Sequence, residues 1–137
     1  MLFLFAMVSL PTLAQTDVEA VKAVITSAYV EGIQNRGNVD DIRKGFHPSF
    51  TMLRLIDNEI KPYPIEEWIA SIEKAKQTSA YPTTRTEAKF ISVDVTDKAA
   101  VVKLELYREN KKTFTDYLSL YKFNEGWRIV SKIYNRH

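Results

Sequence analysis

The stretch FTDYLSLYKFNEGWRIVSKIYNRH, residues 114–137, decides the fold of this chain. Two runs rich in aromatic and β-branched residues flank Asn124-Glu125-Gly126, which fits a three-residue hairpin loop with glycine in the left-handed position. Upstream, from residue 84 onward, apolar and polar residues alternate with a period of two, interrupted by turn signals at residues 96–98 and 109–111. The pattern therefore predicts an antiparallel meander of four strands that ends in this hairpin.

The last hairpin is apolar on both of its faces, which is unusual for a sheet with one side in water. If Phe123 faces Trp127, then Tyr121, Ile129 and Ile133 share their face, and the other face takes a second apolar set. That second set is Leu118, Leu120, Val130 and Tyr134. One face can cover helices and a pocket, and the other needs a cover of its own. A second copy of the chain is the simplest cover, so we expect a homodimer.

Helical patterns occupy the first half of the chain. Residues 16–19, Thr-Asp-Val-Glu, form a capping box that predicts a helix beginning there, and Gly37 stands where a left-handed C-cap is needed. Asn38 caps a second, short helix to about Gly45. His47-Pro48 ends that helix, because a residue before proline is pushed out of the helical region.

A short strand and a third helix follow. Residues 50–56 predict the strand, Asp57-Asn58 the turn after it, and Pro64 the first turn of the helix. Helices gathered first and a meander second predict an α+β fold, with the helices packed on one face of the sheet.

Length and composition limit the classes of function. The 137 residues suffice for one domain, 45% are hydrophobic, and the net charge is +2 with both signs interspersed. A nucleic-acid-binding protein usually carries a larger basic excess on one face, so we expect no nucleic-acid partner. With no cysteine and 2 histidines, a closed zinc site is difficult to build. The chain also lacks a glycine-rich phosphate loop, and we predict no metal and no cofactor.

The N-terminal run MLFLFAMVSLPTLA, residues 1–14, is uncharged and ends in a small-x-small pattern. It is shorter than the roughly 20 residues that cross a bilayer core. We interpret it as a signal peptide cleaved near Ala14, although it lacks the usual basic start. The alternative is a buried N-terminal strand or helix. The first interpretation predicts a periplasmic or secreted domain over residues 15–137, with membrane contact only through the export signal.

Four segments carry a family resemblance: Gly-Phe-His-Pro at 45–48, Ser-Val-Asp-Val-Thr at 92–96, Asp-Tyr-Leu-Ser-Leu at 116–120 and Gly-Trp-Arg-Ile-Val-Ser-Lys at 126–132. With the order of elements, they resemble the nuclear transport factor 2-like superfamily. Within it they are similar to the branch known as putative lumazine-binding, near the SnoaL-like polyketide cyclases. The resemblance implies a cone, in which a strongly curved sheet wraps round the N-terminal helices, leaves a cavity at the wide end and often dimerises. The superfamily includes steroid isomerases, dehydratases, cyclases and non-catalytic members, so the fold alone does not give the chemistry.

Asp116 is the first candidate catalytic residue. With Tyr117 beside it and Tyr134 across the hairpin, it offers the residue types that isomerases of this superfamily use, an aspartate base and a tyrosine donor. The alternative is that Asp116 forms a cross-strand ion pair with Lys132 or Arg136.

His47 is the second candidate, either as a general base at the mouth of the cavity or as a cap on the preceding short helix. The aromatic residues that can line the cavity can equally be ordinary core. They are Phe50, Tyr63, Trp68, Tyr81, Tyr107 and Tyr117.

Three functions remain open. The first is an exported, non-catalytic domain that binds a small apolar or aromatic molecule. The second is an isomerase or cyclase with Asp116 or His47 as base and a tyrosine as donor. The third is an interaction module that pairs through its sheet. No motif brings an acid–base pair together, which favours the first, but a carboxylate within reach of a tyrosine hydroxyl in a closed cavity would favour the second.

Overall fold

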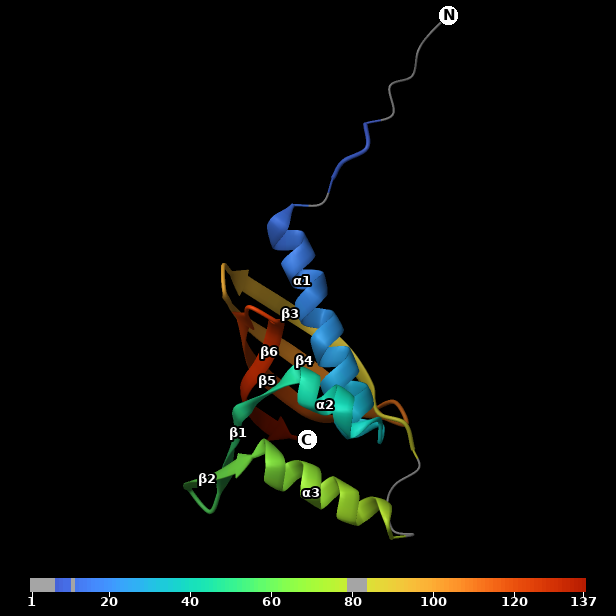
Figure 1. Cartoon of the computed structure of the whole chain (residues 1–137). Coiled ribbons are helices and arrows are strands. Elements are labelled where there is room, and N and C mark those ends of the chain that lie inside the picture. The colour runs from blue at the N-terminus through green and yellow to red at the C-terminus, as the bar shows by residue number, and fades with distance from the viewer. Residues whose placement is uncertain (1–6, 11, 79–83) are drawn as a thin grey trace, which may run out of the picture.

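The computed structural model describes residues 7–10, 12–78 and 84–137. Helix α1 (Leu13–Val24) continues directly into η1 (Ile25–Gln34), a segment with π-helical winding, and the short α2 (Val39–Gly45) follows. The next elements are β1 (Phe46–Ile56), β2 (Glu59–Pro64), α3 (Ile65–Lys76), β3 (Glu87–Thr96), β4 (Ala99–Arg108), β5 (Lys111–Phe123) and β6 (Gly126–Arg136). Figure 1 shows the helices on one side of the sheet, as the α+β prediction requires.

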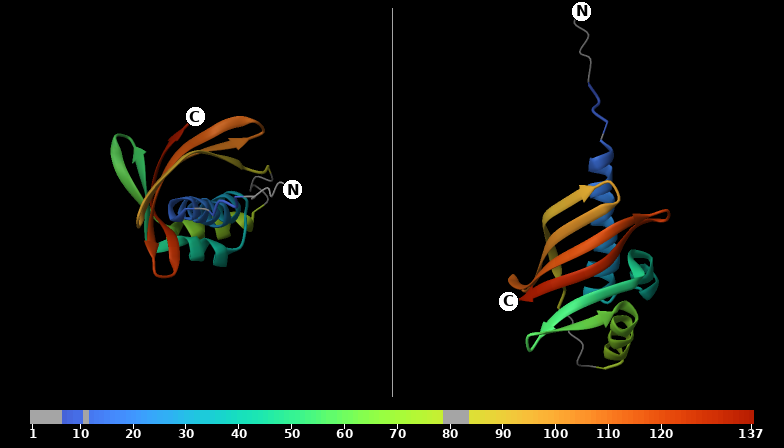
Figure 2. Two further views of the ribbon diagram at one scale, coloured as in Figure 1. Left: turned by 90° about the horizontal axis from the view of Figure 1, so that it is seen from above. Right: turned by 90° about the vertical axis from the view of Figure 1, so that its left-hand side faces the viewer.

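The six strands form one curved sheet in the order β2-β1-β6-β5-β4-β3. Strands β3 to β6 are the predicted antiparallel meander, with turns at the predicted places. One pairing differs from the fully antiparallel prediction, because β1 runs parallel to β6. The chain leaves β2 through α3, restarts at the far edge with β3 and returns strand by strand, so that β6 arrives beside β1. The sheet bends around α1 and η1 (Figure 2).

The core lies between the concave face of the sheet and the helices. Alternate residues of β4, Val102, Leu104 and Leu106, point inward, and their neighbours Asp116, Leu118 and Leu120 on β5 do the same. On β6 the inward set passes through a bulge between Ser131 and Ile129, so that Trp127, Ile129, Lys132 and Tyr134 share the concave face. This bulge explains why the predicted division of the hairpin's apolar residues between two faces is only partly correct.

Turn residues adopt the conformations that their types favour. Asp57 and Asn58 both have positive φ (52° and 61°), as a type I′ hairpin turn requires. Strand β2, which follows this turn, was not predicted from the sequence. Its side chains are largely exposed, so the sequence does not alternate between apolar and polar residues. It also contains prolines, which are tolerated in a sheet mainly on an edge strand, and β2 is such a strand.

Two helix-end predictions differ from the structure. The hydroxyl of Thr16 donates to the carbonyl of Leu13 at 2.8 Å, because α1 already begins at Leu13 and the capping box does not form. The left-handed residue after η1 is Arg36 (φ 61°), not Gly37. A Cβ on Gly37 would lie 2.7 Å from the carbonyl oxygen of Glu31, so close backbone contact explains this glycine. The Asn38 cap is confirmed: its side chain accepts from the backbone N–H of Asp40 at 2.9 Å.

Candidate functional site

The π-helical winding of η1 sets up the site. Backbone bonds that reach back five residues, such as Asn35 N–H to the carbonyl of Val30 at 3.0 Å, widen the helical turn. Tyr29 and Gln34 are five positions apart and would point about 140° apart on an α-helix. Here they lie together, and the Gln34 amide donates to the Tyr29 hydroxyl at 3.2 Å.

Three buried side chains form the centre of the site, and we call Tyr29, Asp116 and Lys132 the buried cluster. The Tyr29 hydroxyl donates to Oδ2 of Asp116 at 2.5 Å, and Nζ of Lys132 donates to the Tyr29 oxygen at 2.6 Å. Nζ also lies 3.2 Å from Oδ1 of Asp116. That contact is an ion pair without hydrogen-bond geometry, so Oδ1 has no hydrogen-bond donor in the described part of the chain.

Strand register brings the two charged residues together. Asp116 on β5 stands directly opposite Tyr134 on β6, and Lys132 is the diagonal neighbour two residues earlier. The predicted ion pair between Asp116 and Lys132 therefore forms, and it forms on the concave face rather than at the surface. Asp116 is 0% exposed and Lys132 4%.

Burial shifts the protonation equilibria of the cluster. Loss of hydration lowers the pKa of the Lys132 ammonium, and the carboxylate of Asp116 opposes this only in part. Burial, followed by the negative charge and hydrogen bond of Asp116, raises the pKa of the Tyr29 phenol well above its usual range. Tyr29 therefore keeps its proton at physiological pH, and Lys132 holds its proton less firmly than a surface lysine.

A recess of about 130 Å³ opens beside the cluster. It is lined by Tyr29, Gln34, Met52, Trp68, Phe114, Lys132 and Tyr134. Liquid water occupies about 30 Å³ per molecule, so the recess has room for about four waters or for the reactive end of a small organic molecule. Its walls are mainly apolar, and its polar groups come from β6 and from η1. Such a combination is typical of small-molecule sites.

The ammonium of Lys132 is surrounded by aromatic rings. Nζ lies 4.7 Å from the ring centre of Tyr29, 5.3 Å from that of Trp68 and 5.0 Å from that of Tyr134. These faces stabilise a cation without offering it an anionic partner. Asp116 lies behind Lys132 and Tyr29 and does not line the recess itself, so a ligand meets the amine and the phenol first.

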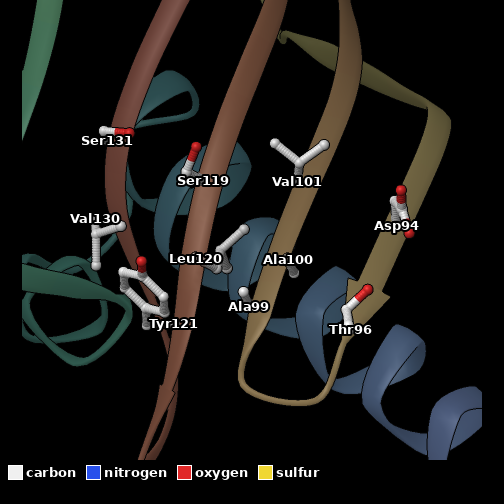
Figure 3. A pocket seen from close by; sticks show the side chains of 10 residues that line it. All are labelled: Asp94, Thr96, Ala99, Ala100, Val101, Ser119, Leu120, Tyr121, Val130 and Ser131. Atoms are coloured by element: carbon white, nitrogen blue, oxygen red, sulfur yellow. The ribbon is translucent and has the colours of Figure 1, made fainter.

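A larger hollow of about 480 Å³ lies on the outer face of β3 to β6 (Figure 3). The figure shows Ser119, Ser131 and Val101 on the side of the sheet away from the helices. Asp94 is the one charged residue among those described in its lining, and Asp94 is exposed. We place the functional site in the smaller recess, because the buried ionisable groups are there.

The sequence profile of the family described as "Putative lumazine-binding" matches residues 16–135. The chain belongs to this family. The lumazine-binding assignment and the cone fold agree with the predicted resemblance. Solved nuclear transport factor 2-like proteins of unknown function share the architecture. One from Shewanella baltica OS155 is 23% identical and covers 93% of this chain and 98% of its own, with a TM-score of 0.74. One from Silicibacter pomeroyi DSS-3 is also 23% identical, covers 92% and 100%, and has the same TM-score of 0.74.

A relative from Cladobotryum sp. that is named for its activity is aldolase FrzH. It is 28% identical over 118 residues, which is 84% of this chain and 90% of the relative. The relative thus corresponds to nearly the whole of this lumazine-binding family domain rather than to a fragment of it.

The structure separates the residues that the sequence singled out. Tyr134 lines the recess with Trp68, and Phe50 and Tyr63 lie behind the Trp68 ring at 6.1 and 6.4 Å between ring centres. Tyr81 lies outside the described residues. In this domain, Trp68 is therefore both core and pocket wall.

Three predicted residues lie away from the recess. Tyr117 is exposed on the outer face, because successive residues of a strand alternate and Asp116 takes the inward position. Tyr107 is bound to Oε2 of Glu105 at 3.0 Å. The ring of His47 stacks on Phe123 at 4.7 Å, and Nδ1 accepts from the N–H of Ser49, so His47 belongs to strand β1 and does not cap α2.

Sequence reasoning missed Tyr29 and Gln34, and it gave Lys132 only as an ion-pair partner. Residues five positions apart point in different directions on an α-helix, so no pattern in the sequence predicted that Tyr29 and Gln34 lie together. Lys132 had a usable signal, because strict alternation in the sequence puts it between the apolar residues Val130 and Tyr134 on one face of the predicted strand.

Proposed function

We propose that the recess binds a small carbonyl compound and that the buried cluster catalyses proton transfer at the carbon next to the carbonyl. The observation that carries this proposal is the hydrogen-bonded contact of Lys132 Nζ with the Tyr29 hydroxyl at 2.6 Å, both at the surface of the recess. This proposal takes up the isomerase or cyclase alternative in preference to binding alone.

The chemistry of the two groups supports a carbonyl ligand. The Lys132 ammonium can stabilise an oxygen on which negative charge develops, and a low-dielectric site strengthens that effect. The Tyr29 hydroxyl, which donates to Asp116 and accepts from Lys132, holds the ammonium in place. The apolar lining from Trp68, Phe114 and Met52 suits the carbon skeleton of such a ligand. The carboxylate of Asp116, which lies behind Lys132 and Tyr29, can accept and hold the proton that is transferred.

The relatives of this chain also support a small carbonyl compound as the ligand. An aldol reaction proceeds through an enol or enolate, which is the species that the recess would stabilise, and the relative from Cladobotryum sp. is named an aldolase. The lumazine-binding family supports a small-molecule ligand in general.

Exchange of α-hydrogens for deuterium tests the proposal directly. Cyclopentanone in deuterated buffer is followed by NMR with and without the mature protein. We expect acceleration over buffer, with general acid–base catalysis contributing about 10²–10⁴-fold. Asp116→Asn should abolish most of it. Asp94→Asn, a matched change in the outer hollow, should leave it intact.

Two results are decisive against catalysis. If the α-hydrogens of cyclopentanone exchange no faster with the wild-type protein than in buffer, although a thermal shift shows that cyclopentanone binds, the domain is a non-catalytic binder. If Asp94→Asn lowers the rate as much as Asp116→Asn, the exchange occurs elsewhere. Cyclopentanol serves as the binding control, because it has the same ring without a carbonyl.

We also propose that the chain is exported. Among the described leader residues, Met7, Val8 and Leu10 are almost fully exposed and do not join the core, as expected of a segment that is removed. Within the described residues no helix is both long and apolar enough to cross a bilayer. N-terminal sequencing of the mature protein tests this proposal, and a chain that retains residues 1–14 contradicts it.

We further propose that the outer face pairs with a second copy of the chain. Val101, Tyr117, Tyr121 and Ile133 form an exposed apolar group there, alongside the outer hollow. Light scattering should give a dimer, and Tyr121→Lys should give a monomer. A monomeric wild type would contradict the proposal.

A further inference from the structure

We propose that Lys132 is a covalent nucleophile whose amine attacks the carbonyl carbon of a small aldehyde or ketone in the recess and forms an iminium. This inference rests on the proposed function, because it assumes that the recess takes carbonyl compounds. It goes beyond that function by giving Lys132 a bond to the substrate in place of a stabilising charge.

The position of Lys132 distinguishes it from a structural lysine. Its side chain is 5% exposed, yet it lines the recess, so a ligand in the recess lies against it. Its stem lies on β6 and its head is fixed by Tyr29, Asp116 and the surrounding rings. A rigidly placed amine beside an apolar cavity has the arrangement that imine-forming lysines need.

The other described lysines that form ion pairs lie at the surface. Lys112 pairs with Glu105 at 2.9 Å and Lys122 with Asp17 at 2.9 Å, and their side chains are 41% and 45% exposed. The hydrogen bond with Glu105 raises the pKa of Lys112. A surface ammonium of this kind is held in the protonated, unreactive form.

The protons of the reaction can be followed on named atoms. A proton passes from the ammonium to Asp116 along two hydrogen bonds: Nζ of Lys132 gives a proton to the Tyr29 oxygen, and the Tyr29 hydroxyl gives its own proton to Oδ2 of Asp116. The nitrogen lone pair then forms the C–N bond, the carbonyl π pair moves to oxygen, and that oxygen takes one proton from the new C–NH2⁺ nitrogen to give the carbinolamine. The proton held on Asp116 returns through the Tyr29 hydroxyl to the carbinolamine hydroxyl, which leaves as water while the nitrogen lone pair forms the C=N bond of the iminium. No oxidant, reductant or further reactant is needed.

The groups that face Nζ support both halves of this sequence. Tyr29 donates to Asp116 and accepts from Lys132, so it links the amine and the carboxylate in one hydrogen-bonded chain. Tyr134 lines the recess on the same strand as Lys132 and places a hydroxyl-bearing ring 5.0 Å from Nζ. Burial lowers the pKa of Lys132, and each unit of lowering raises the neutral fraction at pH 7 about tenfold.

Reductive trapping tests the inference on the intact domain. The protein is incubated at pH 7 with acetone and cyanoborohydride, which reduces an iminium to a stable isopropyl amine. Cleavage after arginine releases the peptide 129–136, in which Lys132 is the single lysine. We expect this peptide to be labelled at least about tenfold faster than any peptide that carries a surface lysine, because only a lysine with a lowered pKa has a sizeable neutral fraction.

Variants complete the test. Lys132→Arg keeps a cation but cannot form an iminium, and it should remove the fast label while circular dichroism shows an intact fold. Lys103→Arg, a change on the outer face, should have no effect.

The outcomes separate this inference from the proposed function. Fast labelling at Lys132 together with α-hydrogen exchange supports both. Exchange without preferential labelling overturns the covalent role and leaves acid–base catalysis standing. Labelling spread evenly over the lysines also overturns the inference. Neither exchange nor labelling overturns both proposals.

Discussion

Removing either charge of the buried Asp116–Lys132 pair should destabilise the domain, with opposite dependences on pH. Asp116→Asn leaves an ammonium without a carboxylate, and Lys132→Met leaves a carboxylate without an ammonium, both in a nearly solvent-free place. Breaking a buried ion pair in this way costs about 3–5 kcal/mol in the free energy of unfolding.

The remaining group can escape part of that cost by becoming neutral. A lysine with an unfolded pKa of about 10.4 loses its proton at pH 7 for about 4.6 kcal/mol, at about 1.4 kcal/mol per pH unit. This limits the cost of Asp116→Asn at pH 7, and the limit falls to about 2 kcal/mol at pH 9. An aspartate of pKa about 3.9 gains a proton for about 4.2 kcal/mol at pH 7 and about 1.5 kcal/mol at pH 5.

The signs follow from proton linkage. In Asp116→Asn the folded state binds fewer protons than the unfolded state, so its stability relative to wild type rises with pH. In Lys132→Met the folded state binds more, so its relative stability rises as pH falls.

Urea unfolding at pH 5, 7 and 9 measures both slopes, and Glu66→Gln, at an exposed ion pair with Arg43, serves as a control with little effect. The double variant Asp116→Asn/Lys132→Met should be close to wild type and nearly independent of pH. Single variants with costs that do not change with pH would refute the assignment of two buried, opposite charges.

Three further outcomes are expected. Gly45→Ala should lower the free energy of unfolding by about 1–3 kcal/mol in urea melts, because the new Cβ would lie 2.2 Å from that of Ala28 where α2 crosses η1; an unchanged midpoint would contradict this close contact. Tyr29→Phe should cost about 1.5–3 kcal/mol by removing a hydrogen bond to a carboxylate, and should also slow α-hydrogen exchange; loss of stability without loss of exchange would make Tyr29 structural only. Hydrogen bonds from Lys122 and the indole of the last hairpin lower the pKa of Asp17 below 3.8, so the stability they contribute is present above that pH and is lost as pH falls through the folded pKa. Asp17→Asn should flatten melting temperatures between pH 5 and pH 3, and an unchanged acid dependence would show that this contact contributes little.

Much of the fold was predictable because its signals are local. Turn types at residues 57–58 and 109–110, the Asn38 cap and the period-two alternation each depend on neighbouring residues. The parallel pairing of β1 with β6 was not predictable in this way. It depends on where the chain re-enters the sheet, and no short stretch of sequence encodes that choice.

The site was less predictable than the fold. Asp116 was identified from its type and its strand, but the hydroxyl that it binds is on Tyr29, 87 positions earlier in the chain. Tyr134 and Tyr117 were better candidates from the sequence than Tyr29, because both are neighbours of Asp116 on the hairpin. Tyr134 lines the recess and Tyr117 is exposed, because side chains alternate along a strand and a bulge shifts this alternation on β6. The position of a bulge depends on packing rather than on residue type.

The wide winding of η1 makes the buried cluster sensitive to chain length as well as to residue identity. A π-helical turn corresponds to one extra residue accommodated within an α-helix. Deleting a single residue between Tyr29 and Gln34 would return the segment to α-helical winding and leave every remaining side chain unchanged. A side chain other than Gln34 would then lie next to Tyr29, beside Asp116 and Lys132. We therefore expect a chain with the same composition but one residue fewer in η1 to keep the cone and to lose this hydrogen-bonded arrangement.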